Sequence, residues 1–116
     1  MIPTHKQLEL AAKATGYQLE DIKGVLHRWV DSETGMGGCW LPWQPVTDKS
    51  DSRDLEVECK ISLLWSNELV RADSHRGIDT FAYYKDYNND KGLATMWAVF
   101  LCAVAIGEAM ADGRSL

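Results

Sequence analysis

The chain has 116 residues, a hydrophobic fraction of 46% and a formal net charge of −5. These values predict a single folded domain with an apolar core and exclude a disordered chain. The acidic balance argues against general nucleic-acid binding and against an anionic membrane surface, because both need a basic face. We therefore expect neither nucleic acid nor a membrane as partner.

Three cysteines, Cys39, Cys59 and Cys102, are scattered along the chain without a C-x-x-C pair. This usage is typical of buried free thiols in a reducing cytoplasm. No Cys or His pair has the spacing of zinc ligands, so we expect no metal and no cofactor. The stretch Met1 to Lys6 has no apolar signal core, which favours a cytoplasmic location.

The first predicted element is a helix from Thr4 to Thr15. Thr4 and Gln7 have the spacing of a capping box, and Gly16 is a natural helix-ending glycine. The stretch that begins at Tyr17 is then expected to lead away from this helix. Two strands are expected next, Gly24 to Asp31 and Cys39 to Trp43, with a glycine-rich turn between them that makes a first hairpin.

The stretch from Trp40 to Asp51 organises the middle of the chain. Pro42 and Pro45 fix their own φ angles and push the residues before them out of the helical region. The stretch must therefore be extended, and its tryptophans stand beside a stiff backbone. It ends on side chains that commonly cap helices, namely Thr47, Asp48 and Ser50.

The segment that follows fits two structures. Leu55 to Leu63 alternates apolar and polar residues, which is typical of a half-buried strand. Val57, Ile61, Leu64 and Trp65 also form a stripe at helical spacing, behind the cap signals and early acids of a helix start. Periodicity alone leaves the choice open.

A second hairpin is predicted from Glu68 to Asp73 and Ile78 to Asp86, with its turn at Ser74 to Gly77. A last helix should begin at an N-cap Asn89 or Asp90 and run to about Ala111. Its segment from Gly92 to Gly107 carries no formal charge, but it is shorter than the roughly 20 residues of a membrane span, so we expect a core helix. Four of its side chains should be buried: Trp97, Phe100, Leu101 and Val104.

Two hairpins can join into one four-stranded antiparallel sheet. Because both faces of the second hairpin carry bulky side chains, the sheet needs helices on both faces. The predicted fold class is therefore α+β, a three-layer α-β-α sandwich that forms a single domain over residues 1–116.

The chain resembles the phage ABA sandwich domain family, small phage and prophage proteins of α-β-α layering. The resemblance covers nearly the whole chain and is most specific in the Trp-x-Pro-x-Thr-Asp piece from Trp43 to Asp48. The Leu8-x-x-Ala-Ala motif and the ending from Ala94 to Met110 also fit. An asparagine would be more usual than Gln44. The resemblance implies a phage origin, the host cytoplasm and a helix from Asp51 to Trp65; it implies no activity.

Aromatic and arginine side chains are the remaining functional signal, because aromatic planes stack bases and arginine forks bind phosphates. No catalytic residue is proposed, since the three histidines are far apart and no nucleophile motif accompanies them. The candidate ligand-binding residues are Trp40, Trp43, Thr47, Arg53, Arg71 and Tyr83.

The first functional hypothesis is a non-enzymatic phage protein that sequesters a nucleotide-derived immune signal of the host, of ADP-ribose type or a cyclic nucleotide. The alternative is a protein that inhibits a host defence protein by direct contact through an acidic face. A small hydrolase using a histidine and an acid ranks last. A homo-oligomer is compatible with each of the three.

Overall fold

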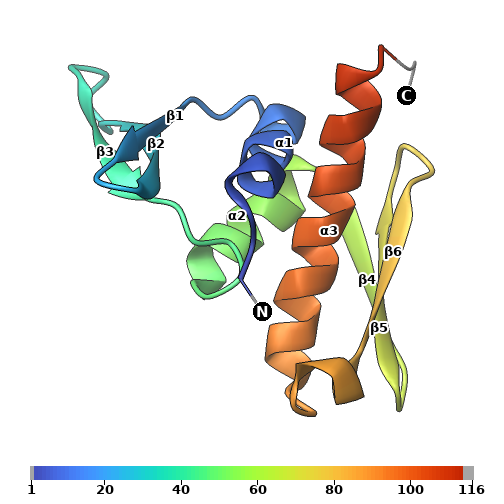
Figure 1. Cartoon of the computed structure of the whole chain (residues 1–116). Coiled ribbons are helices and arrows are strands. Elements are labelled where there is room, and N and C mark those ends of the chain that lie inside the picture. The colour runs from blue at the N-terminus through green and yellow to red at the C-terminus, as the bar shows by residue number, and fades with distance from the viewer. Residues whose placement is uncertain (1, 114–116) are drawn as a thin grey trace.

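A computed structural model describes residues 2–113 and forms a mixed α+β fold (Figure 1). Within this part of the chain there are three α-helices, a short 3-10 helix and six strands. In chain order these elements are α1 (His5–Thr15), β1 (Leu19–Ile22), β2 (Val25–Asp31), β3 (Gly38–Pro42), α2 (Lys49–Glu58), β4 (Ile61–Trp65), β5 (Leu69–Ser74), β6 (Asp79–Tyr83), η1 (Tyr84–Tyr87) and α3 (Lys91–Ala111).

The first and last helices begin where their cap residues predict. The Thr4 hydroxyl accepts a hydrogen bond from the Gln7 amide, and the Gln7 side chain accepts one from the Thr4 amide, each at 3.0 Å. The Asp90 carboxylate caps α3 by accepting from the Leu93 amide at 3.0 Å. Gly16 ends α1 with φ of 80°, a conformation that side chains disfavour. Both predicted helices are confirmed.

Helix α3 is the centre of the core, between α1 and the sheet of β4, β5 and β6 (Figure 1). Trp97, Phe100 and Val104 are buried as predicted, whereas Leu101 is only partly buried. Gly107 lets α1 approach closely, because a Cβ atom there would collide with the Leu10 backbone. By length and composition α3 could cross a membrane, but most of its apolar stretch is buried within the protein, as predicted for a core helix.

The strands form two three-stranded antiparallel sheets, β1-β2-β3 and β4-β5-β6, so the prediction of one four-stranded sheet is wrong. Strand β1 was not predicted, and β4 lies in the segment for which both a strand and a helix had been considered. Strand β1 pairs with β2 through a two-residue turn at Lys23 and Gly24, with φ of 54° and 83°. Positive φ at both turn residues matches the twist of a tight hairpin.

The prediction of a helix from Asp51 to Trp65 is correct only in its first part. Helix α2 ends at Glu58, Lys60 takes a left-handed φ of 53°, and β4 follows from Ile61. The alternation of apolar and polar residues was therefore informative only for the second half of the segment. Ile61 is buried against the core, whereas Leu64 on the opposite face of β4 is 58% exposed.

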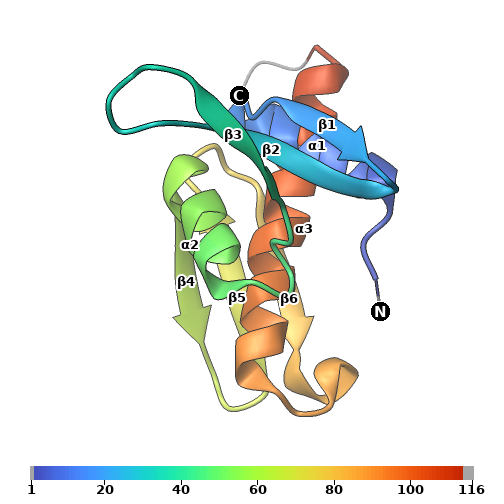
Figure 2. The same cartoon turned by 90° about the vertical axis from the view of Figure 1, so that its left-hand side faces the viewer.

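Helices cover only one face of the second sheet, so the prediction of helices on both faces is also wrong. Figure 2 shows α2 and α3 on the same side of β4, β5 and β6. Val70, Ala72 and Ala82 are buried on that side, whereas Leu64 and Phe81 point to the other side and are more than half exposed. The fold is α+β, but it is not the predicted three-layer sandwich around one sheet.

Candidate functional site

The six side chains predicted to bind a ligand lie in four separate places. Trp40 lies on the first sheet, Trp43 and Thr47 lie in the segment between β3 and α2, Arg53 lies on α2, and Arg71 and Tyr83 lie on the second sheet. The structure therefore does not bring them together into one site.

Trp43 belongs to the core. Its side chain is 2% exposed, its amide donates to the Leu26 carbonyl at 3.0 Å, and its ring meets the Tyr17 ring edge-on at 5.8 Å. It borders an apolar cleft of about 280 Å³ together with Pro45 and Thr47. A ring packed in this way has no free face on which a base could stack, so Trp43 is not an accessible platform.

Trp40 and Trp29 form a cross-strand pair on the first sheet, with ring centroids 5.3 Å apart and an edge-to-face angle of 71°. The Trp29 indole donates to the Asp31 carboxylate at 2.8 Å. Such pairs stabilise neighbouring strands. Trp40 is thus engaged with its own sheet rather than with Trp43.

A polar contact region joins the first sheet to α2. The Arg28 guanidinium lies 4.2 Å above the Tyr17 ring and 3.6 Å from the Asp54 carboxylate. The Asp51 carboxylate accepts the Gln44 amide at 2.9 Å, which fixes the turn into the helix. Burial is the largest cause of a raised pKa at Asp51, opposed by this hydrogen bond.

Arg71 and Tyr83 lie on the uncovered face of the second sheet. The Arg71 guanidinium binds the Asp73 carboxylate at 2.6 Å and the Asp79 carboxylate at 3.1 Å, and it lies 5.7 Å from the Phe81 ring centroid. Two carboxylates therefore already occupy the arginine that was predicted to bind phosphate.

Arg53 borders an open groove between α2 and the start of α3, which we call the α2–α3 groove. Its volume is about 400 Å³. Three segments supply its walls: one face of α2, the end of β4 and the first turns of α3. The lining residues are Lys49, Ser52, Arg53, Glu56, Trp65, Lys91, Gly92, Thr95 and Met96.

Trp65 is the aromatic side chain of this groove. It is 59% exposed, and its indole donates to the Thr95 hydroxyl at 3.0 Å. That hydroxyl in turn donates to the Lys91 carbonyl at 2.7 Å. The two hydrogen bonds fix an exposed ring against the first turn of α3, so the ring is oriented before any ligand arrives.

The α2–α3 groove is cationic although the chain is acidic. Lys49, Arg53 and Lys91 face one carboxylate, Glu56, which leaves the lining with a formal charge of +2 on a chain of −5. Arg53 binds Glu56 at 2.8 Å. The N-cap carboxylates of α2 and α3 bind their own helices, so side chains rather than the helix ends are available for an anion.

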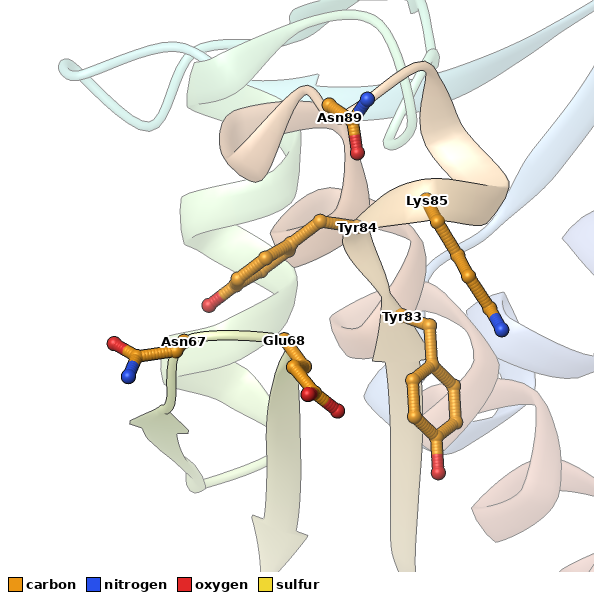
Figure 3. A pocket seen from close by; sticks show the side chains of 6 residues that line it. All are labelled: Asn67, Glu68, Tyr83, Tyr84, Lys85 and Asn89. Carbon is orange, nitrogen blue, oxygen red and sulfur yellow. The ribbon is translucent and has the colours of Figure 1, made fainter.

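A second pocket lies where the turn between β4 and β5 meets η1, and we call it the β5–η1 pocket (Figure 3). Its volume is about 340 Å³. Figure 3 shows the Lys85 chain running beside the Tyr83 ring and the Glu68 carboxylate directed toward the same side. The lining residues are Asn67, Glu68, Tyr83, Tyr84, Lys85 and Asn89.

The groove and the pocket are neighbours on either side of Tyr84. This side chain is buried, and its hydroxyl donates to the Ser66 carbonyl at 2.9 Å. The Lys91 ammonium, which lines the groove, lies 5.5 Å from the Tyr84 ring centroid. The chain from Trp65 to Asn67 runs from one cavity to the other. Both cavities thus open at the end of the molecule where α3 begins.

The remaining reactive groups lie outside both cavities. Burial raises the pKa of the Cys59 and Cys102 thiols to about 11, and Cys39 is exposed, so the prediction of three buried cysteines is wrong for Cys39. The histidines lie on α1, on β2 and in the turn after β5. Residues 2–113 contain no cluster of three or more His, Cys, Asp or Glu side chains that could hold a metal ion.

Comparison with protein-family models, with curated proteins and with solved structures found no match to this chain. The resemblance to the phage ABA sandwich domain family therefore stays a prediction.

Sequence reasoning missed Trp65, Lys49 and Lys91. Trp65 was assigned to the apolar stripe of a helix and thereby to the core. The signal that could have identified it is its position at the end of an apolar run, directly before the polar turn Ser66 to Glu68. No local pattern places Lys49 beside Lys91, because they are far apart in the sequence.

Proposed function

We propose that this protein is a non-enzymatic binding protein that sequesters a nucleotide-type ligand in the α2–α3 groove. The observation that carries the proposal is an exposed and fixed tryptophan, Trp65, beside three cationic side chains on an acidic chain. An aromatic plane stacks any base, and the cations bind its phosphates. In a phage protein, the matching ligand is a nucleotide signal of the host's defence.

Charge supports a phosphate-bearing ligand over a neutral one. Within residues 2–113, Lys49 and Lys91 form no ion pair, so both can bind an anion without breaking one. Arg53 must exchange Glu56 for the ligand, and this exposed pair contributes little to stability. We therefore expect the affinity to fall as salt is added.

The polar groups of the groove favour binding without turnover. The Thr95 hydroxyl accepts from Trp65 and donates to the Lys91 carbonyl. This hydroxyl is therefore engaged on both sides and is not free to act as a nucleophile.

Titration calorimetry with ADP, ADP-ribose and a cyclic dinucleotide tests the proposal. Trp65→Ala should lower affinity by about tenfold to a hundredfold, the effect of one stacked base. Phe81→Ala is the matched control, because Phe81 is 51% exposed but lies on the uncovered sheet face. It should bind as the unaltered protein does.

Two results would contradict the proposal. If the unaltered protein binds none of the three compounds, sequestration of a nucleotide fails, and direct contact with a host protein becomes the working hypothesis. If Trp65→Ala and Phe81→Ala bind equally well, the ligand binds outside the α2–α3 groove.

A further inference from the structure

The two neighbouring cavities differ in charge. The α2–α3 groove has a formal charge of +2, whereas Glu68 and Lys85 cancel in the β5–η1 pocket. An anionic group is therefore favoured in the groove, and a neutral polar group is favoured in the pocket. A ligand with both kinds of group can use the two cavities together.

The β5–η1 pocket has the chemistry that recognises hydroxyl groups. The Asn67 and Asn89 amides each offer donors and acceptors, and the Glu68 carboxylate accepts, as acidic side chains do from ribose hydroxyls. The Tyr83 ring is 44% exposed and gives an apolar plane beside them. These are the groups that a neutral polyhydroxyl ligand, such as a sugar ring, would contact.

The backbone around the pocket is held in an unusual conformation. Asn88 and Asn89 both have positive φ, of 56° and 58°, in the left-handed region that asparagine adopts more readily than most side chains. The Asn89 amide donates to the Tyr84 carbonyl at 2.8 Å, which closes the turn after η1. The two residues form the turn that ends η1, and this turn sets the position of the Asn89 side chain at the pocket.

Lys91, at the border between the two cavities, can bind a phosphate that joins the two parts of a ligand. Lys91 lines the groove and its ammonium lies 5.5 Å from the ring of Tyr84, which lines the pocket. A phosphate bound to Lys91 would thus lie beside both spaces. Lys85 lies beside the Tyr83 ring instead, with its ammonium 5.8 Å from the ring centroid (Figure 3).

We propose that the ligand has two parts, a nucleotide in the α2–α3 groove and a phosphate-linked polyhydroxyl group in the β5–η1 pocket. The ligand class is then a nucleoside diphosphate joined to a sugar rather than a cyclic dinucleotide. This inference rests on the proposed function, because the nucleotide part must bind first in the groove.

The test compares ADP with ADP-ribose by calorimetry on the same protein. ADP-ribose should bind about tenfold tighter, the effect of one charge-assisted hydrogen bond to Glu68. Glu68→Gln and Tyr83→Ala should each reduce this ratio toward one while leaving the affinity for ADP unchanged. Trp65→Ala should weaken both compounds by the same factor.

The outcomes separate the two proposals. If ADP binds and ADP-ribose binds no tighter, the two-part ligand is overturned and the proposed function stands. If the ratio is present but survives both Glu68→Gln and Tyr83→Ala, the sugar is bound elsewhere and the inference fails. If neither compound binds, the proposed function fails and this inference fails with it.

Discussion

Two tryptophans at the ends of strands have opposite surroundings in this protein. Trp43 follows β3 between two prolines and is 2% exposed, whereas Trp65 ends β4 before a polar turn and is 59% exposed. Trp43 is held by a tyrosine ring and by the segment that leads into α2, and Trp65 is held by one hydrogen bond to α3. The first contributes to the core and the second to a surface groove.

The comparison shows that a stiff backbone does not by itself make a binding platform. Pro42 and Pro45 fix the path of the chain, but that path directs Trp43 into the protein, and Pro45 is itself buried. Trp65 has no proline beside it and is fixed by its indole N–H instead. Rigidity and access must occur together in a platform, and only Trp65 has both.

The largest expected effect tests the role of Trp43 in the core. Trp43→Ala should lower the free energy of unfolding by about 3–5 kcal/mol, because it leaves a cavity where a fully packed aromatic side chain was. Chemical denaturation monitored by circular dichroism measures the change. A loss below about 1 kcal/mol would mean that Trp43 is accessible and that the contrast with Trp65 is mistaken.

The second largest effect tests the role of Trp65 in binding. Trp65→Ala should cost roughly 1–3 kcal/mol of binding free energy for ADP. Because the ring is mostly exposed, the same change should alter the free energy of unfolding by only about 0.5 kcal/mol. Calorimetry and denaturation on one preparation give both numbers. A large loss of stability with unchanged binding would reverse the roles that we assign to the two tryptophans.

Chemical labelling of cysteines compares the segment around β3 with the segment around β4 without any substitution. Cys39 lies on β3 and is exposed, whereas Cys59, just before β4, is buried with its thiol pKa raised to about 11. The thiolate is the reactive form, so at pH 8 only Cys39 should react rapidly with iodoacetamide. Mass spectrometry should find one labelled cysteine in the folded protein and three in denaturant. Rapid labelling of Cys59 would indicate that the junction of α2 and β4 opens.

The smallest effect concerns Asp51, which fixes the proline segment to α2. Its pKa is raised by burial, so the folded state keeps this proton more tightly than the unfolded state. The Asp51 contribution to stability is therefore most favourable below its ordinary value of 3.8, and it is lost as pH rises through the folded pKa. Asp51→Asn should remove this pH dependence while an amide oxygen still accepts from Gln44. The measurement is the free energy of unfolding of the unaltered protein and of Asp51→Asn from pH 3 to pH 7. If the difference between these two free energies does not change with pH, this prediction is wrong.

Local sequence signals were sufficient for the helix starts and for most strands. Thr4, Gln7, Gly16 and Asp90 predicted the ends of α1 and α3 correctly, because caps and left-handed glycines act within a few residues. The prediction of one helix from Asp51 to Trp65 failed because α2 and β4 share one continuous apolar pattern. Lys60 carries no signal that would end a helix, yet its left-handed backbone separates α2 from β4.

The candidate site was less predictable than the fold. Arg53 and Tyr83 were named from the sequence, and the structure places them at the groove and at the pocket. Trp40 packs against Trp29, and Trp43 is buried in the core. Arg71 forms ion pairs with two aspartates. Residue type identified groups that can bind a nucleotide, but contacts formed in the folded protein decided which of them are free.

The sequence by itself determined the helix caps, the glycine turns and the apolar character of α3, because these depend on backbone preferences and on periodicity within one segment. The prediction of an extended path between β3 and α2 was wrong for Pro45 to Thr47, which form a turn closed by hydrogen bonds from the Thr47 and Asp48 amides to the Gln44 carbonyl. Only the tertiary structure decided that the strands form two sheets, that one sheet face stays uncovered, and that Lys49, Trp65 and Lys91 share a groove. The reason is that burial and proximity depend on contacts between segments far apart in the chain, and no local pattern encodes which side chain another segment will cover.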